Sequence, residues 1–254
     1  MRQSDWYKHV WTLNAKNQPW TENTEHQVNF IVNKLALKGN ERILDLACGY
    51  GRHSIALARM GFSVTGVDIT EAYIEDAKKT AKELSLEVEF IHADIRDVAC
   101  RDEFDVVLNL DDGAIGYLED DDENLKIFDV ISKALKTGGK HFMGINNADY
   151  ADRCFPSITC EIGENALTIW QNDWDAKTRI LTLGAHNIRY GEIAQKPHFN
   201  MENAHPMRLY SLDELARIFQ QRGMKIIASY SNYSDNESTD KEEVLNVYSI
   251  KEYC

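Results

Sequence analysis

The sequence predicts an α/β fold with a doubly wound, mostly parallel sheet, and two observations carry this prediction. Strand-like and helix-like runs alternate over residues 41–150, which is the pattern of consecutive βαβ units. The alternation returns from residue 208, after a β-rich stretch that lacks it. Because parallel crossovers are right-handed, helices are expected on both faces of the sheet.

The elements of residues 41–150 follow from apolar spacing and from end signals. Gly61 closes the first helix, Thr70 is the expected N-cap of the second, and Gly138 with Gly139 ends the third. The predicted strands are residues 41–47, 62–68, 87–94, 103–110 and 140–146, and the predicted helices are residues 51–61, 70–85 and 122–139.

Three further segments complete the predicted organisation. Residues 1–40 form an N-terminal arm that ends in a helix over residues 21–37 and is rich in aromatic side chains. Residues 151–207 form an inserted β subdomain, because β-rich runs separated by "GEN" and "WDAKT" indicate antiparallel hairpins. Residues 208–254 return to the core with a helix, opened by the capping box of Ser211 and Glu214, and two strands.

Composition limits the partners. The chain has 254 residues, 43% of them hydrophobic, which is enough for one large α/β domain with an insertion. The formal net charge is −13, with 41 Asp and Glu against 28 Lys and Arg, so neither nucleic acid nor an acidic membrane surface is an expected partner.

No window approaches the ~18 apolar residues of a membrane span. The start has no secretory apolar region, and the five scattered cysteines indicate free thiols. We expect a cytoplasmic protein, and a homo-oligomer is compatible with these features.

The stretch "ILDLACGYGR", Ile43 to Arg52, joins the first strand to the first core helix. Glycines at such a turn let the backbone approach a nucleotide that faces the helix N-terminus. A dinucleotide turn needs a third glycine, and this chain has Ser54 there. The carboxylate of Asp45 would repel a pyrophosphate and would suit a cofactor with a cationic amine or a sulfonium.

The run "DLACGYG" resembles the first motif of the class I (Rossmann-like) S-adenosylmethionine-dependent methyltransferases of the small-molecule type. That motif is an acid, a small residue and then G-x-G, and Ala47 stands where a glycine is common. The resemblance covers roughly residues 41–146. It implies S-adenosylmethionine as cofactor and S-adenosylhomocysteine as product. It also implies a seven-stranded sheet whose last strand, within residues 243–253, is antiparallel and lies beside the preceding strand.

The resemblance also implies where the cofactor binds. Asp68 would accept hydrogen bonds from both ribose hydroxyls, a device that NAD enzymes share. Asp94 would accept one from the adenine amino group, although Asp97 stands nearby and either acid can be solvated. The other expected contacts are Asp45, Ala47, Gly49 and Gly51 in the loop, Ile69 and Ile95 beside the adenine, and Asn109 and Leu110 after the fourth strand.

The acceptor side is less defined. Aromatic faces attract a sulfonium or a cationic amine, and a lid excludes water, so the arm is a candidate lid, with ordinary packing as the alternative. Arg208 can pair with a substrate anion or an acid of the arm, or can dock the insertion on the core. The lid candidates are Tyr7, Trp11 and Trp20, and the candidates for a general base are Asp112, Tyr117, His186 and His205.

We therefore expect an S-adenosylmethionine-dependent methyltransferase that acts on a small-molecule N or O acceptor by in-line displacement. Two other functions remain open. One is a regulatory protein that binds the cofactor without transfer, and the other is an NAD-dependent oxidoreductase, which Ser54 and Asp45 disfavour. No metal site is expected, because the histidines lack the spacing of metal ligands.

Overall fold

The computed structural model describes residues 6–17, 21–118, 120–162, 166–191 and 204–252. Its centre is a seven-stranded sheet with the strand order β10-β11-β5-β4-β1-β2-β3. Only β11 runs antiparallel to its neighbours β5 and β10, which confirms the predicted α/β sheet and its inserted last strand. The strands are β1 Arg42–Leu46, β2 Ser63–Asp68, β3 Val88–His92, β4 Phe104–Asn109, β5 Leu135–Asn146, β10 Met224–Ser231 and β11 Val244–Lys251.

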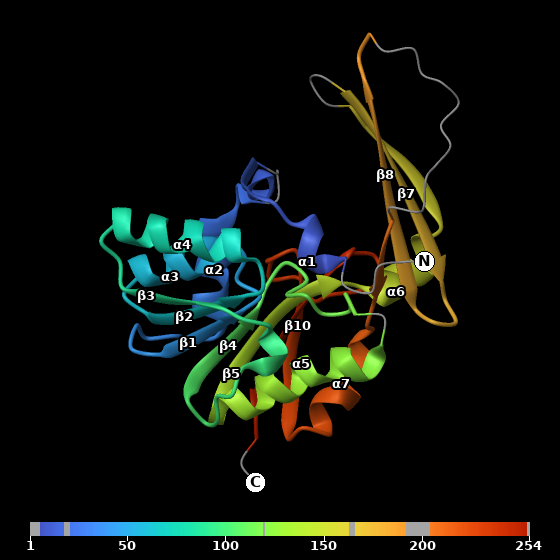
Figure 1. Cartoon of the computed structure of the whole chain (residues 1–254). Coiled ribbons are helices and arrows are strands. Elements are labelled where there is room, and N and C mark those ends of the chain that lie inside the picture. Colours follow the sequence, from blue (N-terminus) through green and yellow to red (C-terminus); the bar gives the residue numbers. More distant parts are fainter. Residues whose placement is uncertain (1–5, 18–20, 119, 163–165, 192–203, 253–254) are drawn as a thin grey trace.

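Helices cover both faces of this sheet (Figure 1). Successive residues of β1 face opposite sides, so Ile43 packs in one hydrophobic cluster and Leu44 in another. One face carries α2 Thr24–Lys34, α3 Arg52–Arg59 and α4 Glu71–Glu83, and the other carries α5 Asp121–Ala134 and α7 Leu212–Gln220. A short 3-10 turn, η3 Ile95–Asp97, follows β3. Burial on both faces explains why β1 carries the apolar residues Ile43, Leu44 and Leu46 on alternating sides.

One of the predicted helix ends was wrong, whereas the N-cap at Thr70 and the capping box at Ser211 were confirmed. Helix α5 stops at Ala134 and does not reach Gly138, because Leu135 already pairs with Phe104 of β4. Thr70 occupies the N-cap position of α4, but its side chain makes no capping hydrogen bond. The capping box of α7 is present, with the Ser211 hydroxyl and the Glu214 side chain bonded reciprocally to backbone N–H groups.

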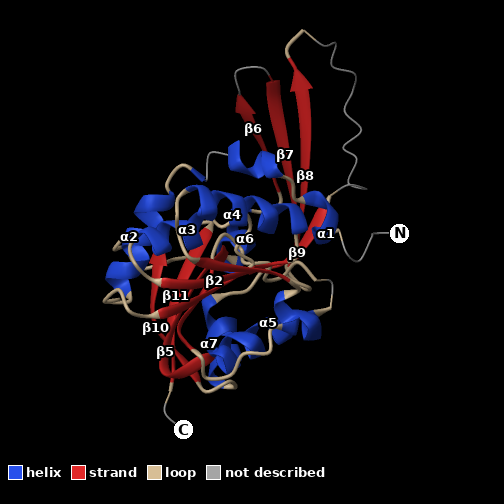
Figure 2. Cartoon of the chain, turned by 60° about the vertical axis from the view of Figure 1, so that its left-hand side comes forward, coloured by secondary structure: helices blue, strands red, loops and turns tan. Residues whose placement is uncertain are grey.

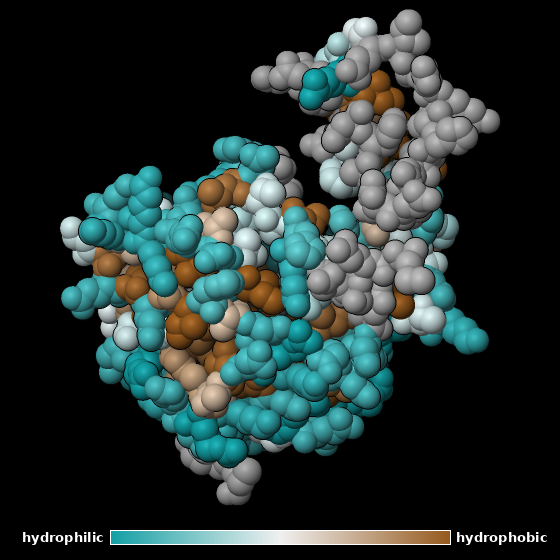
Figure 3. Space-filling model, in the orientation of Figure 1, coloured by the Kyte–Doolittle hydropathy of each residue, from teal (hydrophilic) through white to brown (hydrophobic). Residues whose placement is uncertain are grey.

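A second, four-stranded antiparallel sheet protrudes from the core (Figures 1 and 2). It follows α6 Ala148–Cys154 and consists of β6 Ser157–Ile162, β7 Ala166–Asp175, β8 Ile180–Arg189 and β9 His205–Arg208. Hydrophobic residues lie at its surface, including Ile158 at 65% and Ile162 at 81% exposure, whereas hydrophilic residues cover much of the core face in Figure 3. Its strand β9 is held to the core, because the Arg208 N–H donates to the Gly116 carbonyl at 2.7 Å.

The N-terminal arm crosses the carboxyl edge of the main sheet (Figure 1). It contains α1 Tyr7–Val10 and the 3-10 turn η1 Leu13–Asn17. Two contacts tie it to α4: the Tyr73 hydroxyl donates to the Thr12 carbonyl at 2.9 Å, and Lys16 pairs with Asp76 at 2.5 Å. Within the described residues, none of the helices combines the length and apolar character that crossing a bilayer requires.

Candidate active site

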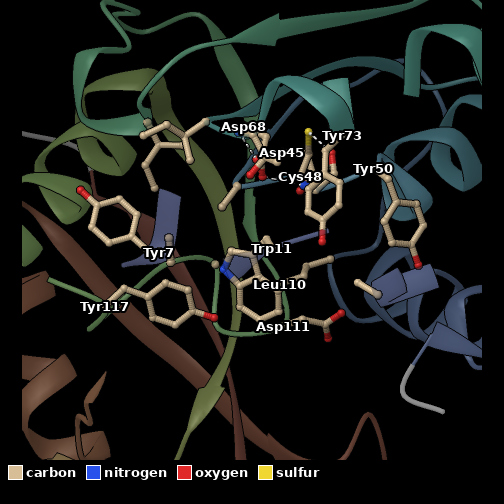
Figure 4. A pocket seen from close by; sticks show the side chains of 18 of the residues that line it. Tyr7, Trp11, Asp45, Cys48, Tyr50, Asp68, Tyr73, Leu110, Asp111 and Tyr117 are labelled. Atoms are coloured by element: carbon tan, nitrogen blue, oxygen red, sulfur yellow. Dashed lines mark hydrogen bonds between the residues drawn. The ribbon is translucent and has the colours of Figure 1, made fainter. Parts of the chain in front are cut away.

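A cavity of about 160 Å³ lies at the carboxyl ends of β1, β2 and β4, beneath the arm. This edge of a parallel sheet is where α/β proteins bind their ligands. Figure 4 shows the carboxylates of Asp45 and Asp68 at one end of the cavity and the rings of Trp11 and Tyr117 at the other. The cavity is therefore shared by the sheet edge and the arm.

The glycine loop after β1 has a left-handed backbone that faces this cavity. Gly49 and Gly51 have φ of +57° and +78°, and Ala47 between strand and loop has φ of +58°. Gly51 is also required by packing, because a Cβ there would lie 2.7 Å from the Phe90 ring. Ala47 and Gly49 line the cavity, whereas Gly51 supports the loop from behind.

Asp68 holds this loop. Its Oδ2 accepts from the Gly49 N–H and its Oδ1 from the Thr70 N–H, both at 2.8 Å. Burial raises the pKa of Asp68, and these two hydrogen bonds oppose that shift. Each carboxylate oxygen has a further lone pair, so the group can still accept from two hydroxyls of a ligand.

Asp45 is almost fully buried and accepts from the Ser54 hydroxyl at 2.6 Å. Burial raises the pKa of Asp45 from 3.8 to about 7, which the Ser54 hydrogen bond and the charge of Arg52 only partly offset. Ser54 stands where a dinucleotide-binding turn would have its third glycine. In this chain that position supports a carboxylate, which is unfavourable for a pyrophosphate.

Apolar side chains and one ion pair form the wall beyond Asp68. Although burial opposes it, the Arg96 guanidinium lowers the pKa of Asp94, and the two groups pair at 2.5 Å. Asp97 is exposed and does not line the cavity. Asn109 is fully buried, and its amide donates to the carbonyls of Leu46 and Gly113, so it shapes the wall from behind. The other predicted contacts that line the cavity are Ile69, Ile95 and Leu110.

Of the candidate bases whose side chains the structure describes, only Tyr117 lines the cavity. Burial, together with nearby Asp112 and Asp111, raises the pKa of Tyr117 well above its ordinary value, so its hydroxyl stays protonated and is unsuited to act as a base. Burial raises the pKa of Asp112 to about 7, but this residue lies behind the wall. His205 stacks on Trp6 with ring centroids 4.5 Å apart, outside the cavity lining.

The remaining predicted acceptor residues fall in different places. Tyr7 and Trp11 line the cavity, and Trp20 lies outside the described residues. His186 belongs to β8 of the protruding sheet, and its side chain is outside the described set. Arg208 does not line the cavity and pairs with Glu214 of α7 at 2.7 Å, which is the docking ion pair considered as its alternative role.

Several cavity residues had no predicted role, among them Arg52, Tyr50 and Tyr73. Arg52, directly after Gly51, donates to Thr24 and Gln27 of α2 and pairs with Asp111. In the sequence, its position directly beside the glycine loop was the signal that could have indicated a place in the cavity. Tyr50 and Tyr73 lie edge to face at 6.0 Å and line the cavity under the arm. Their spacing in the sequence gave no sign that they meet.

The sheet order, the glycine loop and the strand-end acids together define a Rossmann-like fold of the methyltransferase kind. Residues 43–139 match the family described as "Methyltransferase domain". The chain is 25% identical over 206 residues to YqeM of Bacillus subtilis (strain 168), whose name includes the word methyltransferase; the match covers 80% of this chain and 81% of that protein. It is 26% identical over 191 residues to the ubiquinone biosynthesis O-methyltransferase of Pelagibacter ubique (strain HTCC1062), with 75% of each chain covered.

Among solved structures, an S-adenosylmethionine-dependent methyltransferase from Clostridium acetobutylicum ATCC 824 has a TM-score of 0.76 at 18% identity. The superposition covers 95% of this chain and 97% of that one, and it shows a common fold. Together, the domain match and the named relatives support a class I S-adenosylmethionine-dependent methyltransferase.

The residues present fit S-adenosylmethionine. The Asp68 carboxylate suits ribose hydroxyls, and buried Asp45 suits the cationic amino end of the methionine part. Apolar Ile69 and Ile95 offer flat packing to an adenine ring. Among the described residues, no group of three or more His, Cys, Asp or Glu side chains could hold a metal ion.

Proposed function

We propose that this chain transfers the methyl group of S-adenosylmethionine to a nitrogen or oxygen atom of a small molecule. S-adenosylhomocysteine would be the second product. The cover formed by the arm carries the proposal: Tyr7 and Trp11 line the same cavity as Asp45 and Asp68, so the acceptor must fit beneath them. A space closed in this way favours a small acceptor over a folded protein or a nucleic acid.

The protein's own task is to align the reactants and to exclude water. The cofactor, when bound, supplies a methyl group already activated on a sulfonium, so positioning accounts for most of the catalysis. Asp68 and the glycine loop hold the cofactor at one end of the cavity. Trp11 and Tyr117 bound the other end, with their ring centroids 6.2 Å apart.

Contacts with α4 fix the arm in place, which supports its role as a cover. The Tyr73–Thr12 hydrogen bond and the Lys16–Asp76 ion pair both join the arm to α4, which begins beside Asp68. Lys16 also lies 5.3 Å above the Tyr50 ring. The arm therefore rests on residues that border the cofactor end of the cavity, so its release would open that end.

The test is turnover. The protein is incubated with S-adenosylmethionine and pools of amines and hydroxylated metabolites, and the formation of S-adenosylhomocysteine is measured. We expect at least one pool to raise the rate well above that of hydrolysis. If S-adenosylhomocysteine binds but the only methylated products are proteins or nucleic acids from a lysate, the small-molecule proposal is wrong.

A further inference from the structure

The acceptor end of the cavity is aromatic and acidic. Away from the cofactor end, the cavity wall includes several aromatic rings and the carboxylate of Asp111. The Trp11 and Tyr117 rings are nearly parallel, with an interplanar angle of 17°. Figure 4 shows these two rings and Asp111 around the same space. The Tyr7 ring also belongs to this wall, whereas Tyr50 and Tyr73 border the cofactor end.

The basic groups that line the cavity are already engaged. Arg96 pairs with Asp94 and with Glu123 at 2.6 Å. Arg52 pairs with Asp111 and donates to two further oxygens on α2. His53 is held neutral, because burial lowers its pKa to about 3, and its Nε2 lies 2.8 Å from an amide oxygen. Among the described lining residues, then, no cation is left to meet an anionic acceptor.

Among the described residues, Asp111 is the acid that lines this end of the cavity. Asp111 pairs with Arg52, whereas Asp112, the next residue in the loop after β4, lies behind the wall, where burial raises its pKa to about 7. Both carboxylates act on the Tyr117 hydroxyl, whose pKa is raised first by burial and then by these two charges. The acceptor end therefore combines aromatic faces with a carboxylate and has no unpaired cation among its described residues, which is an environment that attracts cations.

The backbone that presents these carboxylates is strained. Four consecutive residues, Asp111 to Ala114, have φ between +51° and +71°. Three of them are not glycine, and such a conformation costs about 1–2 kcal/mol for each L-residue. The loop is held there by the Asp112 N–H, which donates to the Gly144 carbonyl at 2.9 Å. Backbone strain of this kind is typical of functional loops.

Building on the proposed function, we propose that the acceptor is an amine that arrives as a cation and binds between the Trp11–Tyr117 ring pair and Asp111. An anionic acceptor would find no unengaged cationic partner among the described lining residues. The Asp111 carboxylate, 36% exposed, takes one proton from the ammonium group and passes it to water. The nitrogen lone pair then forms the bond to the methyl carbon while the carbon–sulfur bond breaks. That electron pair returns to sulfur, and the product leaves as a methylated ammonium ion.

Sinefungin tests this site without knowledge of the acceptor. In this analogue a carbon that bears a protonated amine replaces the sulfur and its methyl group, so the ammonium points toward the acceptor end. Calorimetry compares its affinity with that of S-adenosylhomocysteine, for the wild type and for Asp111→Asn. We expect sinefungin to bind the wild type roughly tenfold or more tightly than S-adenosylhomocysteine. Most of that advantage should be lost in Asp111→Asn.

Two further variants keep the test decisive. Asp213→Asn changes an exposed acid on α7, away from the cavity, and should keep the full advantage. Trp11→Leu removes one ring from the arm without touching the core, and it should reduce the advantage even if Asp111→Asn fails to fold. Equal affinities for the two ligands in the wild type, or an advantage that survives both cavity variants, would overturn the proposal. Failure of S-adenosylhomocysteine to bind at all would refute the proposed function itself.

Discussion

Replacing Asp68 by asparagine tests whether one carboxylate holds both the glycine loop and the cofactor ribose. The two oxygens of Asp68 accept from Gly49 and Thr70, each at 2.8 Å. An asparagine keeps one acceptor oxygen and turns an NH2 donor toward one of these N–H groups. A hydrogen bond to a charged acceptor contributes about 1.5–3 kcal/mol, so affinity for S-adenosylhomocysteine should fall roughly 10- to 150-fold.

The assay is calorimetric titration of the wild type and Asp68→Asn with S-adenosylhomocysteine, after thermal melts confirm that both proteins are folded. Asp97→Asn is the matched control, because this acid also follows a strand of the same sheet edge but is exposed and outside the cavity. The control should bind like the wild type. If Asp68→Asn is folded and also binds within about twofold of the wild type, the ribose assignment is wrong.

Three further predictions concern pH, packing and the arm. Because burial raises the pKa of Asp45 to about 7, its contribution to stability is present below pH 3.8 and is lost as pH rises through 7. Over this pH range, the unfolding free energy of the cofactor-free Asp45→Asn variant should therefore fall less steeply than that of the wild type. The two slopes should differ by up to about 1.4 kcal/mol per pH unit, and identical slopes in urea titrations would contradict this. Gly51→Ala should cost about 1–3 kcal/mol more than Gly61→Ala in chemical denaturation. The reason is that both glycines have positive φ but only Gly51 has atoms within 4 Å of the added Cβ, so equal losses would contradict the packing argument. Tyr73→Phe removes a hydrogen bond to the arm, so stopped-flow release of S-adenosylhomocysteine should accelerate by up to about tenfold, and an unchanged rate would argue against a cover.

Much of the core could be predicted from the sequence, because its signals are local. The first strands carry apolar runs that end in Asp45 and Asp68, and the glycines follow at fixed spacing. A parallel sheet brings such strand ends to one edge, so the cofactor half of the cavity followed from the sequence. The end of α5 did not, because the pairing of Leu135 with Phe104 is a tertiary contact that overrides the glycine signal.

The acceptor half depends on contacts between distant segments. Arg52 meets Thr24, Gln27 and Asp111 only after α2, α3 and the loop after β4 have packed. Arg208 was a candidate for substrate binding, but its partner is Glu214, six residues further on at the start of α7. Neither the partners of Arg52 nor the partner of Arg208 could be identified from composition or spacing. The same holds for the position of Tyr73 beneath the arm.

The most direct test of the central claim is a calorimetric titration of the whole chain with S-adenosylhomocysteine, with NAD titrated in parallel. We expect micromolar binding of S-adenosylhomocysteine and no measurable binding of NAD. This follows from the buried Asp45 with its Ser54 hydrogen bond, and from the Asp68 carboxylate that holds the glycine loop. Binding of NAD alone, or of neither ligand, would contradict the assignment of this cavity.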